Sequence, residues 1–271
     1  MRGAASGAKS GIEIRELHLM EEFEDVSRLY AAIWRTDAGA GPLPAEVMRA
    51  LAHAGNYVAG VYEDGRLTGA SVAFFGEPVG TTLHSHITGA SMGRGIGLAL
   101  KLHQRQWALA RGLRRITWTY DPLIRRNAHF NLVKLGARPE EYLQSFYGAM
   151  DDVINRGDES DRVLTAWDLT APAEGTGPPD RPDRPDRPER PGRAAHGVRN
   201  LEGRPVIGPT DADTVLIDLP DDIESLRRTD PGAARAWRLA VRHTLGGLLA
   251  EGARVAGFHD RRSYVVHRTA A

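Results

Sequence analysis

A glycine-rich segment in the middle of the chain has the composition of an anion-binding turn. It lies between an expected strand at residues 81–88 and an expected helix at residues 95–110. Glycines let backbone N–H groups turn inward without a Cβ clash, and the helix N-terminus adds partial positive charge. Phosphate is the usual ligand of such a turn, although a tight packing turn between strand and helix has the same glycine spacing. The segment consists of Met92, Gly93, Arg94, Gly95, Ile96, Gly97 and Leu98.

Two familiar phosphate-binding loops do not fit this turn. A Rossmann dinucleotide site is disfavoured because the turn lies in mid-chain and the strand after the helix does not end in the expected ribose-binding acid. A Walker loop is excluded because no Gly-Lys-Ser/Thr follows at the required spacing. The residues of this turn therefore argue against a nicotinamide-dependent oxidoreductase.

Two histidines alternate on the strand that precedes the turn. His84 and His86 are two positions apart, so their side chains point to the same face. With an ordinary pKa of about 6.5, imidazole can accept a proton at neutral pH. A hydrogen-bonded sheet histidine is the structural alternative for each. We expect no metal site, because no third acidic or histidine ligand has matching spacing.

The overall composition excludes several classes of protein. Of 271 residues, 41% are hydrophobic and 26% charged, and Lys plus Arg and Asp plus Glu both number 35. This balance provides no long-range field that would attract nucleic acid or an anionic membrane. The chain has no cysteine, which excludes disulfides, thiolate metal sites and a cysteine nucleophile. No apolar run approaches the roughly 20 residues that span a bilayer, and the N-terminus lacks an apolar signal core. We therefore expect a cytoplasmic protein.

A proline-rich repeat marks the clearest boundary. Between residues 179 and 191 a proline stands at every third position, separated by Asp, Glu and Arg. Proline removes backbone donors and fixes φ, so the expected state is an extended, solvated spacer, with a partner-docking segment as the alternative. The predicted organisation is a disordered tail at 1–11, a first domain at 12–170, a linker at 171–196 and a small C-terminal subdomain at 197–271.

The apolar periodicity predicts an α/β (α+β) fold, a mixed sheet flanked by helices. The C-terminal subdomain is predicted as β-α-β-β, too small for a core of its own, so we expect it to pack on the first domain or on a partner. Before the linker, strands are expected at 12–17, 56–62, 67–75, 81–88, 115–119, 142–150 and 164–169, and helices at 20–34, 44–53, 95–110 and 127–135. After it, strands are expected at 214–219, 255–259 and 264–267, and a helix at 231–250.

The order of these elements and the segment Met92–Gly97 resemble motif A of the GNAT N-acyltransferase superfamily. In that family a Gln or Arg followed by glycines cradles the pyrophosphate of coenzyme A, and Met92 departs from this pattern. The likeness covers residues 12–169. A more specific likeness, to one subfamily of uncharacterised predicted acetyltransferases, lies in Leu100-Lys101, Gln104-Arg105, 118–123, 126–137, 146–148 and 160–162.

The resemblance implies a GNAT-like mixed, mostly antiparallel sheet flanked by helices, an acyl-CoA co-substrate such as acetyl-CoA and no metal cofactor. It implies direct attack of an amine on the thioester, with His84 or His86 as the base. The backbone of Ile87, Thr88 and Gly89 would pair with the pantetheine arm. Asn127 and Asn131, one helical turn apart, would contact coenzyme A or the substrate.

The general acid and the acceptor site are less clear from the residues. The helix tyrosine that family members use falls here on Leu132, which cannot donate a proton, so Tyr147 is the best replacement. Asp121, at a strand end, would orient the amine or a histidine, with turn capping as the alternative. Arg162 is the preferred anchor for a substrate carboxylate, followed by Arg126 and Arg125.

The resulting prediction is an N-acyltransferase that moves an acetyl or other short acyl group, succinyl included, to a primary amine. The expected acceptor is a small metabolite, an amino acid in first place. A protein of another class, a coenzyme-A sensor or scaffold that has lost catalysis, is the alternative. The C-terminal subdomain would complete the acceptor pocket or form a homodimer contact.

Overall fold

A computed structural model describes residues 11–36, 41–91, 95–148, 158–170 and 194–269. The chain divides into two compact units, the first ending at Arg114 and the second beginning at Arg115. This division falls inside the predicted domain at 12–170, because the strands after Arg115 share a hydrophobic core with the C-terminal elements. In the part of the chain that is described, no helix is both long and apolar enough to cross a membrane.

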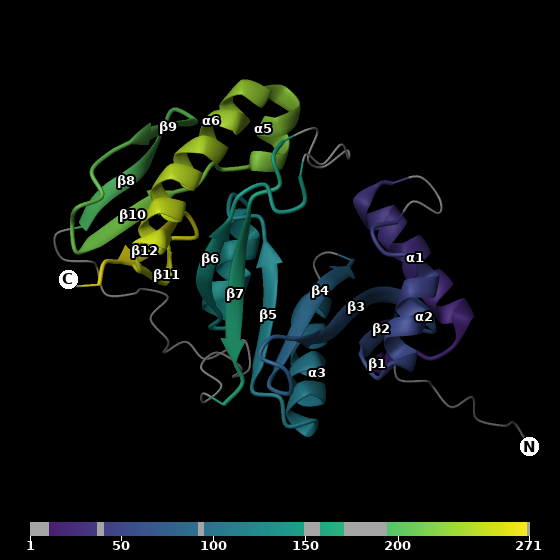
Figure 1. Ribbon diagram of the computed structural model, residues 1–271. Coiled ribbons are helices and arrows are strands. Elements are labelled where there is room, and N and C mark those ends of the chain that lie inside the picture. The colour runs from purple at the N-terminus through teal and green to yellow at the C-terminus, as the bar shows by residue number, and fades with distance from the viewer. Residues whose placement is uncertain (1–10, 37–40, 92–94, 149–157, 171–193, 270–271) are drawn as a thin grey trace, which may run out of the picture. The chain divides into compact units, whose positions relative to one another are not determined.

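The first unit contains a four-stranded antiparallel sheet and three helices (Figure 1). Each strand pairs with its neighbour in the order β1-β2-β3-β4. Asp64 and Gly65, with φ of 50° and 77°, make the tight turn between β2 and β3 that the sequence predicts. The elements are β1 Ile12–Glu16, α1 Met20–Trp34, α2 Ala45–His53, β2 Tyr57–Glu63, β3 Arg66–Gly76, β4 Thr82–Ala90 and α3 Ile96–Ala110.

Helices cover both faces of this sheet. Phe23, Val26 and Tyr30 of α1 and Met48 of α2 pack with Val72 and its neighbours on one face. On the other face Ile96 and Leu100 of α3 pack against Val61. Because strand side chains alternate between faces, β4 presents one set of residues to α1 and another to α3.

The second unit begins with three strands and a short helix. The strands form the antiparallel order β5-β7-β6, and helix α4 continues directly into the π-helical segment η1. The elements are β5 Arg115–Tyr120, α4 Arg125–His129, η1 Phe130–Lys134, β6 Arg138–Leu143 and β7 Arg162–Asp168.

The predicted strand at 142–150 is wrong at residues 144–148, and residues 149 and 150 lie outside the described part of the chain. Ser145 and Gly148 have positive φ values of 45° and 74°, which a strand cannot accommodate, and residues 145–148 form a turn. The predicted helix at 127–135 is present but begins at Arg125 and changes to π geometry at Phe130.

The C-terminal part of the second unit is a five-stranded sheet covered by helices, larger than the predicted β-α-β-β piece. Its order is β11-β12-β10-β8-β9, and only the β10–β8 pair is parallel. The elements are β8 Ala194–Leu201, β9 Arg204–Ile207, β10 Thr214–Asp218, α5 Ile223–Thr229, α6 Pro231–Val241, η2 Arg242–Gly246, α7 Gly247–Ala250, β11 Arg254–His259 and β12 Ser263–His267.

Three of these elements, β8, β9 and α5, were not expected from the sequence. Strand β8 begins at Ala194, so the predicted linker at 171–196 extends too far, while residues 171–193 lie outside the described part of the chain. The expected helix at 231–250 is confirmed, in the three consecutive pieces α6, η2 and α7.

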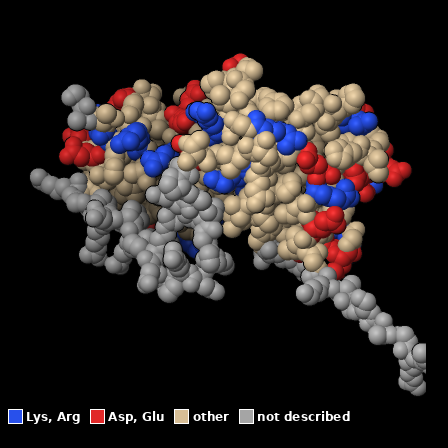
Figure 2. Space-filling view, turned by 90° about the horizontal axis from the view of Figure 1, so that it is seen from below, with Lys and Arg blue, Asp and Glu red and all other residues tan. Residues whose placement is uncertain are grey.

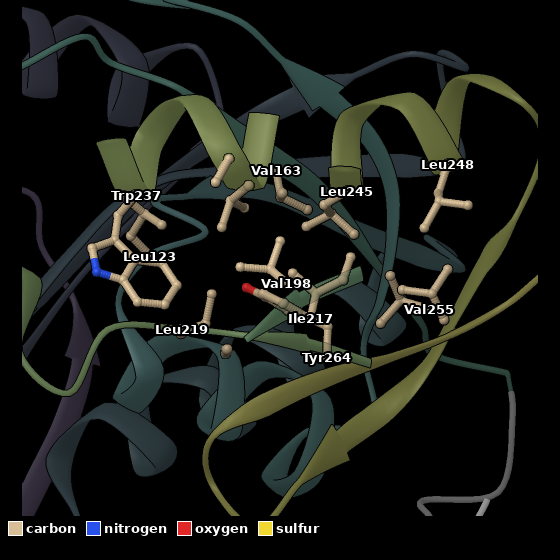
Figure 3. Packing of buried hydrophobic residues seen from close by; sticks show 14 of the residues in the cluster. Leu123, Val163, Val198, Ile217, Leu219, Trp237, Leu245, Leu248, Val255 and Tyr264 are labelled. Atoms are coloured by element: carbon tan, nitrogen blue, oxygen red, sulfur yellow. The ribbon is translucent and has the colours of Figure 1, made fainter. Parts of the chain in front are cut away.

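One hydrophobic cluster joins the two halves of the second unit. Trp237 and Leu245, from α6 and η2, pack with Leu123, Val163 and Tyr264 (Figure 3). The C-terminal segment therefore packs on residues of the predicted first domain, although it is larger than the piece from which this packing was expected.

Candidate functional site

The described part of the glycine-rich turn opens helix α3. Gly95 lies in the left-handed region with φ of 72°, where a side chain would be strained, and its carbonyl accepts the first helical hydrogen bonds from Leu98 and Ala99. Among the described residues, no atom outside the helix's own backbone lies within 4 Å of a Cβ placed on Gly97, so these residues leave the first turn of α3 open above this glycine. Met92, Gly93 and Arg94 lie outside the described residues. An open first turn preceded by a left-handed glycine is suited to an anion.

The β4 residues predicted to pair with pantetheine have both faces occupied. Ile87 packs with the core beneath α1, and a Cβ on Gly89 would come within 2.9 Å of the Trp34 ring. Thr88 shares a hydrogen bond of 2.8 Å with Ser71. Their side chains thus hold the strand in place, and any contact with a ligand falls to the backbone.

His84 and His86 lie on one face of β4, and both rings contact the Phe74 ring. Their ring centroids are 5.2 and 5.7 Å from that of Phe74. The pairing of β3 with β4 shifts between Val72 and Ala73, which leaves His86 as an extra residue opposite β3. Burial, and then the charges of His86 and Lys101, lower the pKa of His84 to about 4. Burial also lowers the pKa of His86, so both rings are neutral at pH 7.

The opposite face of β4 covers a buried polar network that sequence reasoning did not identify as a site. Lys101 of α3 donates to the Ser85 hydroxyl at 2.8 Å and to the Gln104 side-chain oxygen at 3.3 Å. The Gln104 side-chain amide in turn donates to the Ser71 hydroxyl, which shares a hydrogen bond with the Thr88 hydroxyl. Burial lowers the pKa of Lys101 to about 7. The sequence does contain a signal for this network. Lys101 and Gln104 lie about one turn apart on the face of α3 that packs on the sheet, and the other buried residues of that helix are apolar.

The low pKa of Lys101 predicts an unusual pH dependence of stability. Between about pH 7 and 10.4 the unfolded chain binds a proton at this amine that the folded chain does not, so stability rises with pH. We expect the free energy of unfolding to increase from pH 7 to 9 by at most about 1.4 kcal/mol per pH unit, and the increase to be absent in Lys101→Met. Urea denaturation across this range measures it. The exposed Lys134→Met is the control that keeps the increase; an increase retained in Lys101→Met would contradict the prediction.

In the second unit, Tyr147 and Arg162 lie together. Tyr147 is 44% exposed and packs edge-on against Phe146, and the Arg162 guanidinium lies 5.3 Å from its ring centroid. Arg162 also donates to the carbonyl oxygen of Asp161 at 2.9 Å, and burial lowers its pKa. The tyrosine and the arginine that the sequence predicted as acid and substrate anchor are thus neighbours, Tyr147 on the turn at 145–148 and Arg162 at the start of β7.

Asp121 is buried in an ion-pair network. Its carboxylate accepts two hydrogen bonds from Arg238, at 2.9 and 3.0 Å, and one from Arg227 at 2.5 Å. It also accepts the backbone N–H of Leu123. Burial opposes ionisation, but the two guanidinium groups hold the pKa of Asp121 well below its usual range. Asp121 is therefore fully engaged within the protein, and orienting a substrate amine would require breaking these contacts.

Most of the remaining predicted site residues form ion pairs, hydrogen bonds or core contacts within the second unit. Arg126 forms a bidentate ion pair with Glu224, and Arg125 forms an ion pair with Asp221 at 2.8 Å. Asn131 is buried and accepts a hydrogen bond of 3.2 Å from the Trp118 indole, whereas Asn127 is only partly buried. Leu132, at the position of the family's tyrosine, packs on the core of the unit.

The charges on the one face that is drawn give no separate indication of a site. On the face shown in Figure 2, basic and acidic side chains are interspersed among the described residues. No group of three or more His, Asp or Glu side chains that could hold a metal occurs in the described ranges.

Comparison with known proteins relates the chain to acetyltransferase structures. No protein-family model and no curated protein matches the sequence. The fold is similar to an N-acetyltransferase from Staphylococcus aureus Mu50 (18% identity, TM-score 0.49), over 59% of this chain and 99% of that one. A GNAT-family acetyltransferase from Streptococcus pneumoniae matches with 20% identity and a TM-score of 0.46, over 58% and 98% of the two chains. The ribosomal-protein-S18-alanine N-acetyltransferase from Escherichia coli matches with 12% identity and a TM-score of 0.48, over 62% and 99%.

Proposed function

We propose that the chain is an acyl-CoA-dependent N-acyltransferase. The observation that carries the proposal is strand β4 with two neutral histidines, followed by a left-handed Gly95 at the open first turn of α3. A neutral base is required to take a proton from an amine, and an open helix N-terminus favours the pyrophosphate of coenzyme A. The residue-level resemblance to motif A of the GNAT superfamily supports the same activity.

The chemistry that we propose is one displacement. The neutral amine nitrogen attacks the thioester carbonyl, the new C–N bond forms as the C–S bond breaks, and a histidine takes the proton that the nitrogen loses. The departing thiolate takes a proton from an acid, for which Tyr147 is our candidate. Three effects lower the pKa of His84 but only burial lowers that of His86, so we expect His86 to be the stronger base.

We infer that the acceptor is a small amine that also carries a carboxylate, as an amino acid does. Arg162 supports this inference, because a guanidinium binds a carboxylate through paired donors and this one lies 5.3 Å from the ring of Tyr147, the candidate acid. Arg126, whose guanidinium pairs with Glu224, is the second candidate. The acyl group is acetyl or another short group, succinyl included.

A release assay for free thiol tests the proposal. The protein is mixed with acetyl-CoA or succinyl-CoA and with amino acids of both configurations, simple amines and peptides. We expect thiol release above background hydrolysis with at least one acceptor that has both an amine and a carboxylate. Coenzyme A binding without turnover across the panel would favour the sensor or scaffold alternative, which the apolar Leu132 supports. Absence of coenzyme A binding would contradict both functions.

Substitution of the histidines in the same assay tests the base. His86→Gln is expected to lower kcat by about 10²–10⁴-fold, the usual contribution of a general base, with the affinity for acyl-CoA unchanged. Because both histidine pKa values are lowered, the acid limb of the wild-type kcat profile should lie below about pH 6.5. His84→Gln identifies the alternative base, and the exposed His53→Gln is the matched control. If both β4 variants keep the wild-type kcat and profile, neither histidine is the base.

A further inference from the structure

The turn that carries Tyr147 is fastened to the residues just before β7. The backbone N–H of Phe146 donates to the carbonyl of Ser160, and that of Tyr147 donates to the Ser160 hydroxyl at 2.8 Å. The Ser160 hydroxyl donates onward to the carbonyl of Gly148. The backbone N–H of Ser145 donates to the Asp161 carboxylate at 3.0 Å. Ser160 and Asp161 thus hold the whole turn through its backbone.

Asp161 is itself held by a residue from the C-terminal part of the chain. Its buried carboxylate receives two hydrogen bonds from Arg242, from Nε at 2.9 Å and from Nη2 at 2.6 Å. Tyr142 donates a third at 2.7 Å. Arg242 also pairs with Glu159. The contacts of Arg242 with Asp161 and Glu159 join residues 81 and 83 positions apart in sequence.

Arg242 stands at the point where helix α6 changes to the π-helical segment η2. A π segment inserts one residue into a turn and so re-aims the side chains beside it, and such segments are frequent at functional sites. The Arg242 side chain is 18% exposed, so its contact with Asp161 is largely removed from water. A buried ion pair of this kind adds little net stability compared with apolar packing, but its paired geometry fixes orientation.

We propose that Arg242 is a positioning residue for the acceptor amine: through Asp161 it fixes the turn at residues 145–148 and holds Tyr147 against Arg162. The C-terminal segment is then part of the acyltransfer machinery, and the carboxylate-bearing acceptor is recognised only when this segment is folded. The role of Arg242 in catalysis rests on the proposed function. The structural role, in which Arg242 holds the turn through Asp161, does not depend on that function.

Three variants test the link: Arg242→Met, which removes the contact, Arg242→Lys, which keeps the charge but loses the paired geometry, and the exposed Arg235→Met on the same helix as control. Hydrogen exchange followed by mass spectrometry on a peptide covering residues 143–148 reports the turn directly. For Arg242→Met we expect exchange there about tenfold faster, corresponding to roughly 1.4 kcal/mol of lost protection. Arg242→Lys should show most of this effect and Arg235→Met none.

Kinetics on the same variants test the catalytic meaning. In Arg242→Met the KM for the acceptor should rise about tenfold while the KM for acyl-CoA stays within about twofold of wild type. Wild-type exchange at 143–148 in both Arg242 variants would overturn the positioning role. Faster exchange with an unchanged acceptor KM would overturn its catalytic meaning, as would an equal rise of both KM values. A wild-type protein without turnover on any acceptor would count against the proposed function, and the exchange result would still decide whether Arg242 holds the turn.

Discussion

Replacing Asp121 with Asn is expected to lower the free energy of unfolding by about 3–5 kcal/mol. The substitution keeps the shape of the side chain but removes the negative charge between Arg227 and Arg238, both of which are buried. Asp158, at 3.0 and 2.9 Å from these two arginines, is then left to balance them alone. The loss is large because a buried charge without its partner keeps the full cost of leaving water. Urea denaturation at pH 7 measures the change.

The matched control is Asp221→Asn. Asp221 also pairs with an arginine of the same unit, Arg125, but its side chain is 83% exposed, so the expected change is within about 1 kcal/mol. The pH dependence gives a second check. The pKa of Asp121 is lowered in the folded protein, so its contribution is present above the unfolded pKa of about 3.9 and is lost as the pH falls toward the folded value. The difference in the free energy of unfolding between wild type and Asp121→Asn should therefore become smaller below about pH 4. Equal losses for the two variants at pH 7 would contradict the prediction.

The elements with strong local patterns were predictable from the sequence. Helix α1 spans Met20–Trp34 as predicted, because Phe23, Val26 and Tyr30 repeat at the helical period and all face the core. The β2–β3 hairpin follows from Asp64 and Gly65, two residues that tolerate positive φ. The expectation that His84 and His86 share a face is confirmed by their common contact with Phe74.

Elements that depend on distant contacts were not predictable. Strand β8 has little apolar alternation, and Gly197 within it is explained only by tertiary packing, since a Cβ there would come within 2.7 Å of Val215 and 2.8 Å of Thr244. The turn at 145–148 contains Phe146 and Tyr147, whose high strand propensity favours the strand that the sequence predicts there. Its backbone hydrogen bonds to Ser160 and Asp161 override that propensity.

The candidate site shows the same division between local and long-range information. The paired histidines follow from spacing within one strand, which a sequence displays directly. The partners of Asp121 lie 106 and 117 positions away, and no local pattern links a carboxylate at a strand end to arginines of a later helix. The same holds for Arg126, whose partner Glu224 is 98 positions away. Sequence spacing identified the reactive residue types but not which of them were already paired.

Trp237→Ala is expected to destabilise the second unit by about 3–5 kcal/mol, the usual range for removing a buried tryptophan from a core. Trp237 is fully buried among Leu123, Val163 and Leu219 (Figure 3), and its indole N–H donates to the carbonyl of Gly203 at 2.9 Å. The variant leaves a cavity and an unpaired carbonyl, which act in the same direction. Urea denaturation followed by far-ultraviolet circular dichroism measures the loss.

Leu239→Ala, two residues further along α6, is the control. Its side chain is 48% exposed, so the expected change is within about 0.5 kcal/mol. The same helix places Trp237 in the core and the next residue, Arg238, against Asp121 and Asp158. Loosening α6 at Trp237 should therefore weaken the ion pairs as well, and the losses from Trp237→Ala and Asp121→Asn should be less than additive in the double variant. Full additivity would show that the core and the ion-pair network are independent, and equal effects of the Trp237 and Leu239 variants would show that Trp237 is not the centre of this core.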